Sequence, residues 1–170
     1  MQIKDKYYPW AKNLPKELSI KLATLFGLGN LTAPGTWGAA AGVFLYPLLF
    51  INLNVPAYLF LAIVLAYLAI GICDAAEIHL NRRDPGMINL DEFVAMPFCY
   101  FNIFGVEYNL WGLLLGFALF RFFDIKKPSV IYKLQSLEGG LGCVADDVAA
   151  ALASSLCLSI FALIFNFVIC

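Results

Sequence analysis

The sequence is poor in charge. Charged residues make up 14% of the 170 residues, whereas hydrophobic residues make up 62%. A water-soluble domain of this length cannot bury so many apolar side chains, because much of its surface must face solvent. The 11 Lys plus Arg are matched by 12 Asp plus Glu, so the basic excess that is typical of nucleic-acid binding is missing. We therefore predict an integral membrane protein that binds no nucleic acid.

Histidine and paired cysteines are also scarce. The single histidine, His79, excludes lipid phosphatases that need one histidine as nucleophile and another as acid. The five cysteines include no C-x-x-C pair, so neither a disulfide framework nor a thiolate zinc site is indicated. None of them is followed by arginine six positions later, which excludes a cysteine phosphatase. The D-x-x-D-G-x-x-A-R pattern of CDP-alcohol phosphotransferases is absent as well.

Apolar residues instead form long runs that predict membrane-spanning helices. Residues 37–53 and 57–73 are two such runs, and residues 148–170 are the last. Residues 93–120 are also apolar, but their interruption at 102–109 predicts a hairpin of two short or tilted helices. Small residues at the start of the first and last runs favour close packing between helices. We therefore predict an all-α integral membrane bundle of about four transmembrane helices.

The N-terminal part is more polar and divides into two segments. Residues 1–17 carry lysines among aromatic residues, which predicts a cytoplasmic or interfacial arm. Residues 18–33 are apolar but interrupted, and we interpret them as a half-inserted helix that opens a single membrane-embedded catalytic domain over residues 18–170. No short apolar run with a small-residue cleavage site follows the lysine-rich start. We expect the first hydrophobic segments to stay in the mature chain.

Basic residues predict the orientation of the bundle. In this arrangement all 11 lysines and arginines fall on one side, in residues 1–21, at Arg82 and Arg83, and in residues 121–133. By the positive-inside rule, we expect that side to be cytoplasmic. The agreement also supports the hairpin, because a single span over residues 93–120 would move the second polar segment across the membrane.

Carboxylates interrupt the apolar sequence in residues 84–92, where Asp84, Asp91 and Glu92 occur within nine residues. Ionised groups near hydrocarbon are expensive, so a function must retain them. Asp146 and Asp147 form a second acidic pair. Carboxylate oxygens without histidine or cysteine partners favour magnesium, which commonly shares its coordination with substrate phosphate. We predict a magnesium site at which water or a carboxylate attacks a phosphate ester.

A third polar stretch supplies cations. Arg121, Asp124 and Lys127 are spaced by three residues, which places them on one face of a helix, where they could address one ligand. Gly140 and Gly142 either let the backbone approach a phosphate or simply form a turn. The simpler interpretation of the acidic pairs is helix capping, and that of basic residues is lipid anchoring. We favour one joint site, since three polar stretches fall on the same side of a small membrane body.

A small ion or solute transporter is the main alternative, because carboxylates near spans also mark ion pathways. A transporter predicts acids at mid-membrane and internal repeat symmetry. Here nearly all of the acids flank the spans on one side, and no repeat is evident. A structural lipid-binding protein is a further, weaker alternative.

At these residues the chain resembles the phosphatidylglycerophosphatase A family of bacterial membranes, from Leu25 onward. The matching motifs follow the family's order: Ala33-Pro34-Gly35-Thr36-Trp37-Gly38, Ala75-Ala76-Glu77 with Asp84-Pro85-Gly86 and Asp91-Glu92, Arg121-Phe122-Phe123-Asp124 with Lys127-Pro128, and Gly139-Gly140-Leu141-Gly142 with Asp146-Asp147. Asn89-Leu90 departs from the two apolar residues that the family commonly has there. The N-terminal arm has no counterpart in the family.

The resemblance implies an enzyme of the bacterial inner membrane, with its active site at the cytoplasmic face. It would use magnesium to remove the terminal phosphate of the phospholipid phosphatidylglycerophosphate, leaving phosphatidylglycerol. The expected metal ligands are Asp91, Glu92, Asp146 and Asp147, with Asp84 and Asp124 as further ligands or a general base. The expected phosphate-binding residues are Arg121, Lys127, Thr36, Gly140 and Gly142. All of this requires Asp91 and Asp147 to meet in one pocket.

Overall fold

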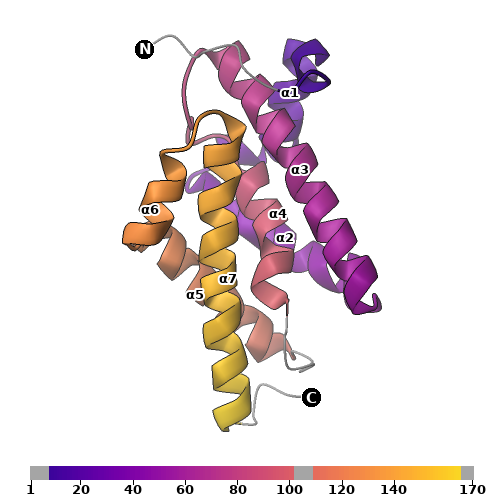
Figure 1. Ribbon diagram of the computed structural model, residues 1–170, viewed down its shortest axis with the longest axis vertical. Coiled ribbons are helices and arrows are strands. Elements are labelled where there is room, and N and C mark those ends of the chain that lie inside the picture. Colours follow the sequence, from indigo (N-terminus) through magenta and orange to yellow (C-terminus); the bar gives the residue numbers. More distant parts are fainter. Residues whose placement is uncertain (1–7, 102–108, 166–170) are drawn as a thin grey trace.

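The computed structural model describes residues 8–101 and 109–165, where every regular element is a helix (Figure 1). In chain order these are η1 (Ala11–Asn13), α1 (Lys16–Ala23), η2 (Leu25–Asn30), α2 (Pro34–Leu49), α3 (Val55–Leu80), α4 (Leu90–Tyr100), α5 (Leu110–Lys126), α6 (Ser129–Gln135) and α7 (Gly140–Phe165). The all-α prediction is therefore confirmed for the described ranges.

Helices α3 and α7 are long and apolar enough to cross a membrane. Each has 26 residues, which corresponds to about 39 Å of helix against a hydrocarbon core of about 30 Å. Among the described residues, no other helix meets that length and composition. Helices α2, α4 and α5 cover other predicted spans but have 16, 11 and 17 residues. The number of full spans remains a prediction, and the turn of the hairpin, residues 102–108, lies outside the described residues.

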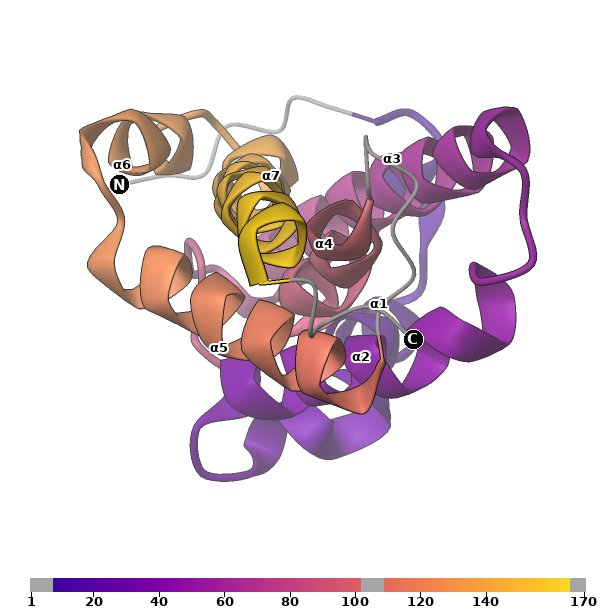
Figure 2. The same cartoon turned by 90° about the horizontal axis from the view of Figure 1, so that it is seen from below.

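Helix α4 occupies the centre of the bundle. It packs against α2, α3, α5 and α7, as Figure 2 shows along the bundle. Met96 and Tyr100 of α4 are fully buried, so in a membrane they hold the helices together through van der Waals packing. Gly42 of α2 permits the close approach, since a Cβ atom there would lie 2.7 Å from Met96 Cγ. Small residues therefore do mediate close helix packing here, as predicted.

The second polar segment is more helical than we expected. The last apolar run was predicted to begin at residue 148, but α7 begins at Gly140, so Asp146 and Asp147 lie in its second turn. The helix can start early because Gly139 adopts a left-handed φ of +66° before it. The Gly140 N–H then donates to Asp74 Oδ1 of α3 at 3.1 Å, which satisfies one of the free amides of the first turn. Burial on a helix holds the acidic pair in fixed positions.

The first polar segment agrees with expectation. Helix α3 continues beyond its apolar run through Asp74 and Glu77 and ends at Leu80. Both carboxylates are buried. Residues 81–89 then form the connection to α4, in which Asp84 has a left-handed φ of +42°. This connection carries Asp84 alongside the start of α4.

The described part of the N-terminal arm lies against α3. Trp10 covers Gly71, where a Cβ atom would stand 2.3 Å from the indole ring. Tyr8 makes an edge contact with Tyr67 at 5.7 Å between ring centroids. A cavity of about 190 Å³ between the arm and α3 is lined in part by Lys12, Asp74 and His79. The arm is thus packed on the helical body, while its position relative to a membrane remains a prediction.

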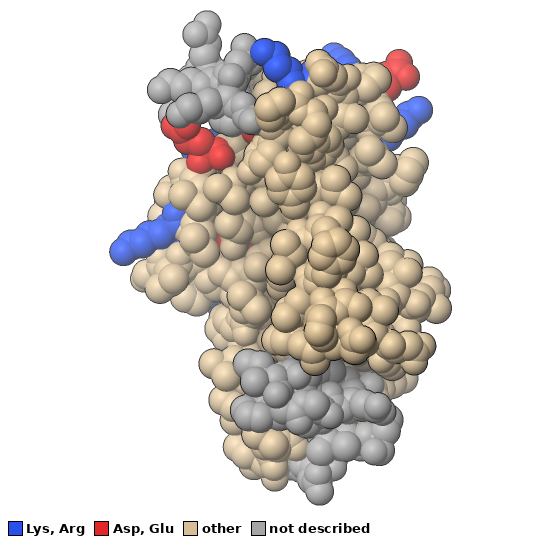
Figure 3. Space-filling view, turned by 45° about the vertical axis from the view of Figure 1, so that its right-hand side comes forward, with Lys and Arg blue, Asp and Glu red and all other residues tan. Residues whose placement is uncertain are grey.

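Charged side chains gather toward one end of the molecule. On the face in Figure 3, they lie toward the upper end, and the lower end of the described surface shows none. Large apolar side chains are exposed along the helices instead, including Phe44 of α2, Phe60 of α3 and Ile164 of α7. An exposed apolar surface of this kind suits contact with lipid. The distribution agrees with charges grouped on one side of the bundle, as the sequence predicts.

Candidate active site

Asp91 and Glu92 begin the acidic site in the first turn of α4, where the helix dipole favours negative charge. Asp91 is buried, and its Oδ1 accepts a hydrogen bond from the Glu92 N–H at 3.1 Å. Burial raises the pKa of Asp91 above the ordinary aspartate value. For Glu92, burial and the neighbouring Asp91 charge raise the pKa well above its usual value. The helix dipole favours acids at this position in the chain, but burying two of them together remains costly.

Asp147 joins this pair from α7. One carboxylate oxygen from each of Asp91, Glu92 and Asp147 lies within 4.8 Å of the others. Oxygens at that separation can surround one small cation, because magnesium binds oxygen at about 2.1 Å. The expected meeting of Asp91 and Asp147 is therefore found. These residues are far apart in sequence, and the packing of α4 on α7 brings them together.

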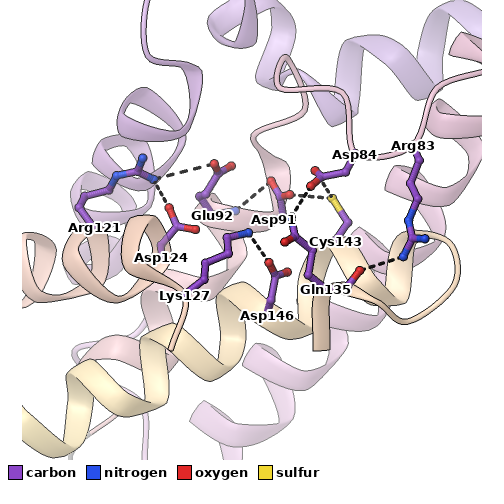
Figure 4. A network of polar contacts seen from close by, with 10 residues as sticks. All are labelled: Arg83, Asp84, Asp91, Glu92, Arg121, Asp124, Lys127, Gln135, Cys143 and Asp146. Atoms are coloured by element: carbon purple, nitrogen blue, oxygen red, sulfur yellow. Dashed lines mark hydrogen bonds and ion pairs between the residues drawn. The ribbon is translucent and has the colours of Figure 1, made fainter. Parts of the chain in front are cut away.

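Arg121 faces the same group from α5. Its Nη1 lies 2.7 Å from Asp124 Oδ2 and 3.9 Å from Glu92 Oε1 (Figure 4). Arg121 and Asp124 thus share a helix face, as their spacing predicted. Lys127, the third residue of that prediction, instead lies just beyond the helix, with a left-handed φ of +40°. The first turn of α2 closes this side, because a Cβ atom on Gly35 would lie 2.1 Å from Glu92 Oε1. Thr36 follows Gly35 in the same turn and is half-buried.

Lys127 occupies the C-cap of α5 and points toward α7. Its Nζ lies 2.5 Å from Asp146 Oδ2, and the Asp146 side chain is almost entirely buried. Burial alone would lower the pKa of Lys127, but the hydrogen bond and charge of Asp146 outweigh it, so that pKa is raised. Lys127 therefore keeps its positive charge within the acidic site.

Asp84 lies at the exposed edge of the site. Its N–H donates to Glu77 Oε1 at 2.6 Å, and its Oδ2 accepts from Gln135 Nε2 at 2.9 Å. Arg83 holds the same region by donating to the backbone oxygens of Gln135 and Leu137, at 2.8 and 2.7 Å. These hydrogen bonds tie the segment between α3 and α4 to the end of α6. They hold Asp84 beside the buried acids of α4.

Several residues around the site had no role in our sequence-based prediction. Glu77 was named from the sequence only as part of a motif, although in the structure its carboxylate accepts a hydrogen bond from the Asp84 N–H. Cys143, one turn before Asp147 on α7, places its Sγ 2.7 Å from Asp91 Oδ2. Gln135 and Cys143 carry no local sequence signal of a site. Gly35 did offer one, since its Pro-Gly-Thr turn opens a helix.

Gly140 and Gly142 differ from their predicted role as phosphate-binding residues. The Gly140 N–H is bonded to Asp74, and the Gly142 N–H donates to the Gly139 oxygen at 2.9 Å. A Cβ atom on Gly140 would lie 2.0 Å from the Ile70 oxygen of α3. The two glycines therefore let α7 start close to its neighbours, and their amides already have partners inside the protein.

A model of the family described as phosphatidylglycerophosphatase A matches residues 21–162. The chain belongs to the phosphatidylglycerophosphatase A family. The match extends from α1 into α7 and includes every residue of the acidic site, whereas residues 1–17 lie outside it. The chain is therefore a phosphatase, and the transporter alternative has no support.

Curated relatives agree with this family. Phosphatidylglycerophosphatase A of Haemophilus influenzae is 39% identical over 133 residues, which cover 77% of this chain and 80% of that protein. Phosphatidylglycerophosphatase A of Escherichia coli K12 is 30% identical over 139 residues, covering 79% and 77%. A Bacteroides thetaiotaomicron protein with the provisional name phosphatidylinositol-3-phosphatase is 31% identical over 150 residues, covering 86% and 94%. No solved structure matches the chain.

Together with the apolar helices α3 and α7, membership of the phosphatidylglycerophosphatase A family indicates a membrane protein. The acidic group at Asp91, Glu92 and Asp147 offers a place for a metal ion in that enzyme.

Proposed function

We propose that this phosphatase hydrolyses the terminal phosphate monoester of phosphatidylglycerophosphate, releasing phosphatidylglycerol and inorganic phosphate. The observation that carries the proposal is the convergence of Asp91, Glu92 and Asp147 beside Arg121, in a chain of this family. Water would supply the oxygen that adds to phosphorus, and the phosphorus–oxygen bond to the lipid would break. The lipid then leaves as an alcohol. Two relatives named phosphatidylglycerophosphatase A support this choice of substrate.

Magnesium is the cofactor that the site fits best. The donors of the Asp91, Glu92 and Asp147 group are all carboxylate oxygens, which hard cations prefer. Within the described ranges, Glu92 Oε2 and Asp146 Oδ1 are buried without a hydrogen-bond partner, so ligand positions are open. Asp91, Glu92, Asp146 and Asp147 would hold the ion. Bound magnesium would supply a Lewis acid that offsets charge on the phosphate.

Arg121 and Lys127 would orient the phosphoryl oxygens. Arginine suits this task because its planar group can bind two phosphate oxygens at once. The ion pair of 2.7 Å favours Asp124 as the residue that positions Arg121, in place of the ligand or base role first expected. Thr36 would donate from the Pro-Gly-Thr turn that closes the same side of the site.

Asp84 is the proposed general base. It is the exposed acid of the site, so water reaches it, while the hydrogen bond that its backbone N–H donates to Glu77 keeps it in position. A carboxylate nucleophile that forms an aspartyl phosphate is the competing mechanism. Acid quenching of single turnovers with substrate radiolabelled in its terminal phosphate separates them, because an aspartyl phosphate would leave label on the protein, whereas direct attack by water releases all of the label as inorganic phosphate.

The distribution of polar and apolar surface fits a lipid substrate. We place the acidic site at headgroup level on the cytoplasmic face of a bacterial inner membrane, where the phosphate of the lipid lies. The acyl chains would remain in the bilayer alongside exposed apolar residues such as Phe44 and Phe60. The enzyme would thus bind its substrate without extracting it from the membrane.

The deciding experiment is phosphate release from phosphatidylglycerophosphate in mixed micelles, with and without magnesium. We expect release that requires magnesium and is reduced by about a hundredfold or more in Asp91→Asn, which removes one proposed ligand charge. Phosphatidylinositol 3-phosphate and phosphatidic acid serve as competing substrates. Magnesium-independent release, an unaffected variant, or a preference for either competitor would contradict the proposal.

A further inference from the structure

Two thiols lie next to the acidic site and have no part in the proposed reaction. Cys143 of α7 and Cys73 of α3 are both buried, in one cluster that also contains Val94 of α4. The two side chains adjoin closely enough to interact. Magnesium does not use thiol ligands, so its binding gives these residues no role.

Cys143 is directed at two of the site's carboxylates. Its Sγ lies 2.7 Å from Asp91 Oδ2 and 3.8 Å from Asp84 Oδ1, and Figure 4 marks both contacts with dashed lines. One ligand atom from each of Asp84, Asp91 and Cys143 lies within 4.8 Å of the other two. This is a second group with the spacing of a metal site, and it shares Asp91 with the all-oxygen group.

The ligand types of the two groups differ. A thiolate with two carboxylates suits zinc, which binds cysteine sulfur and carboxylate oxygen in a tetrahedral arrangement. The all-oxygen group suits magnesium. Asp84 is the exposed member of the group, so one of the three ligands lies at the solvent boundary.

We infer that Asp84, Asp91 and Cys143 form a binding site for zinc or another thiophilic divalent cation, and that this cation inhibits the enzyme by taking Asp91 from magnesium. The cation would displace the Cys143 proton to solvent, since thiolate is the ligand form. Only the inhibition rests on the proposed function, because cation binding can be measured without any substrate.

Cadmium is the probe for the site itself, because its bond to thiolate gives an ultraviolet charge-transfer absorption. We expect purified wild-type protein to show a saturable absorption, and Cys143→Ser to lose it. Cys157→Ser is the matched control, since Cys157 lies on the same helix outside the site and should leave the absorption unchanged. Absence of the absorption in wild type, or its persistence in Cys143→Ser, would overturn the inference.

Asp84→Asn provides a second variant that does not alter the buried core. It keeps the thiol but removes an exposed carboxylate, so we expect cadmium affinity to fall by about tenfold or more. Equal affinity in Asp84→Asn and wild type would remove Asp84 from the site.

Competition tests the link to magnesium. Raising magnesium should shift the cadmium titration of wild type to higher cadmium concentration, and an unshifted titration would refute a shared Asp91. In the phosphatase assay, zinc should inhibit, and the half-inhibitory concentration should rise about tenfold or more in Cys143→Ser, measured relative to that variant's own zinc-free rate. If the protein releases no phosphate from phosphatidylglycerophosphate, the proposed function fails, and the cadmium titrations still decide whether the site exists.

Discussion

Gly35 of α2 lies so close to Glu92 of α4 that a Cβ atom on it would stand 2.1 Å from Glu92 Oε1 and 2.9 Å from Arg121 Nη1. The position tolerates no side chain unless both of these groups move. Because Gly35 lies on a helix with ordinary dihedrals, the constraint comes from close approach rather than from backbone strain.

Gly35→Ala should therefore impair catalysis more than folding. Overpacking of this kind costs about 1–3 kcal/mol, and displacement of Glu92 and Arg121 should lower kcat/KM by about tenfold or more. Gly86→Ala is the matched control, since a Cβ atom there meets nothing within 4 Å. Steady-state kinetics and thermal unfolding of both variants test the expectation, and equal kcat/KM in the two would contradict it.

Arg121→Lys should weaken substrate handling while it leaves cation binding largely intact. Lysine keeps the charge but loses the planar group that can bind two phosphate oxygens, so kcat/KM should fall by about a hundredfold. The half-saturating magnesium concentration should change little. Lys126→Ala, at an exposed position in the last turn of α5, is the control and should retain activity. A normal kcat/KM in Arg121→Lys would exclude Arg121 from phosphate binding.

Lys127→Ala should destabilise the protein by about 1–3 kcal/mol, because it leaves the buried Asp146 carboxylate without its partner at 2.5 Å. Adding Asp146→Asn should recover much of that loss, since it removes the unpaired charge. The double variant should nevertheless remain inactive if both residues serve the site. Denaturant unfolding and phosphate release on the two single variants and the double variant complete the cycle. Strictly additive stabilities would show that the pair is not coupled.

The raised pKa values of Asp91 and Glu92 predict how stability depends on pH. The native state holds these protons more tightly than the unfolded state, so unfolding free energy should fall as pH rises above the ordinary carboxylate range. A cation that binds the carboxylates should oppose this fall, and its apparent affinity should increase with pH as it displaces the protons. Thermal unfolding across pH, with magnesium or with a chelator, measures both effects. The prediction would be contradicted if, with chelator present, the stability of the wild-type protein did not change with pH and matched that of Asp91→Asn.

The helices and the meeting of the polar stretches could be predicted from the sequence for clear physical reasons. Apolar runs of sufficient length indicated α3 and α7, and the spacing of Arg121 and Asp124 placed them on one helix face. The start of α7 could not be located in this way. Asp146 and Asp147 were expected just before a helix because charges usually end an apolar run, but here α7 buries them from its second turn.

Contacts that depend on how the helices pack could not be predicted from the sequence. Cys143 looks like any apolar cysteine until α7 turns its sulfur toward Asp91, and Gln135 reaches Asp84 from a helix 51 residues later. Gly140 illustrates the opposite case. A glycine-rich turn before an acidic pair suggests a phosphate-binding loop. In the structure, however, the Gly140 N–H donates a hydrogen bond to Asp74 of α3.

The contact between α4 and α7 sets the distance between metal-binding oxygens, because Asp91 and Glu92 belong to one helix and Asp147 to the other. A slip of α7 by one turn would displace Asp147 by about 5.4 Å, more than the 4.8 Å that spans the oxygen group. Ala150 and Ala151 are fully buried in one cluster with Met96, one turn away from Asp147. Their small size thus sets how closely α7 approaches α4, and with it the spacing of the oxygens. A larger side chain at either position should lower the affinity of the enzyme for its metal ion, even though neither residue belongs to the proposed substrate site.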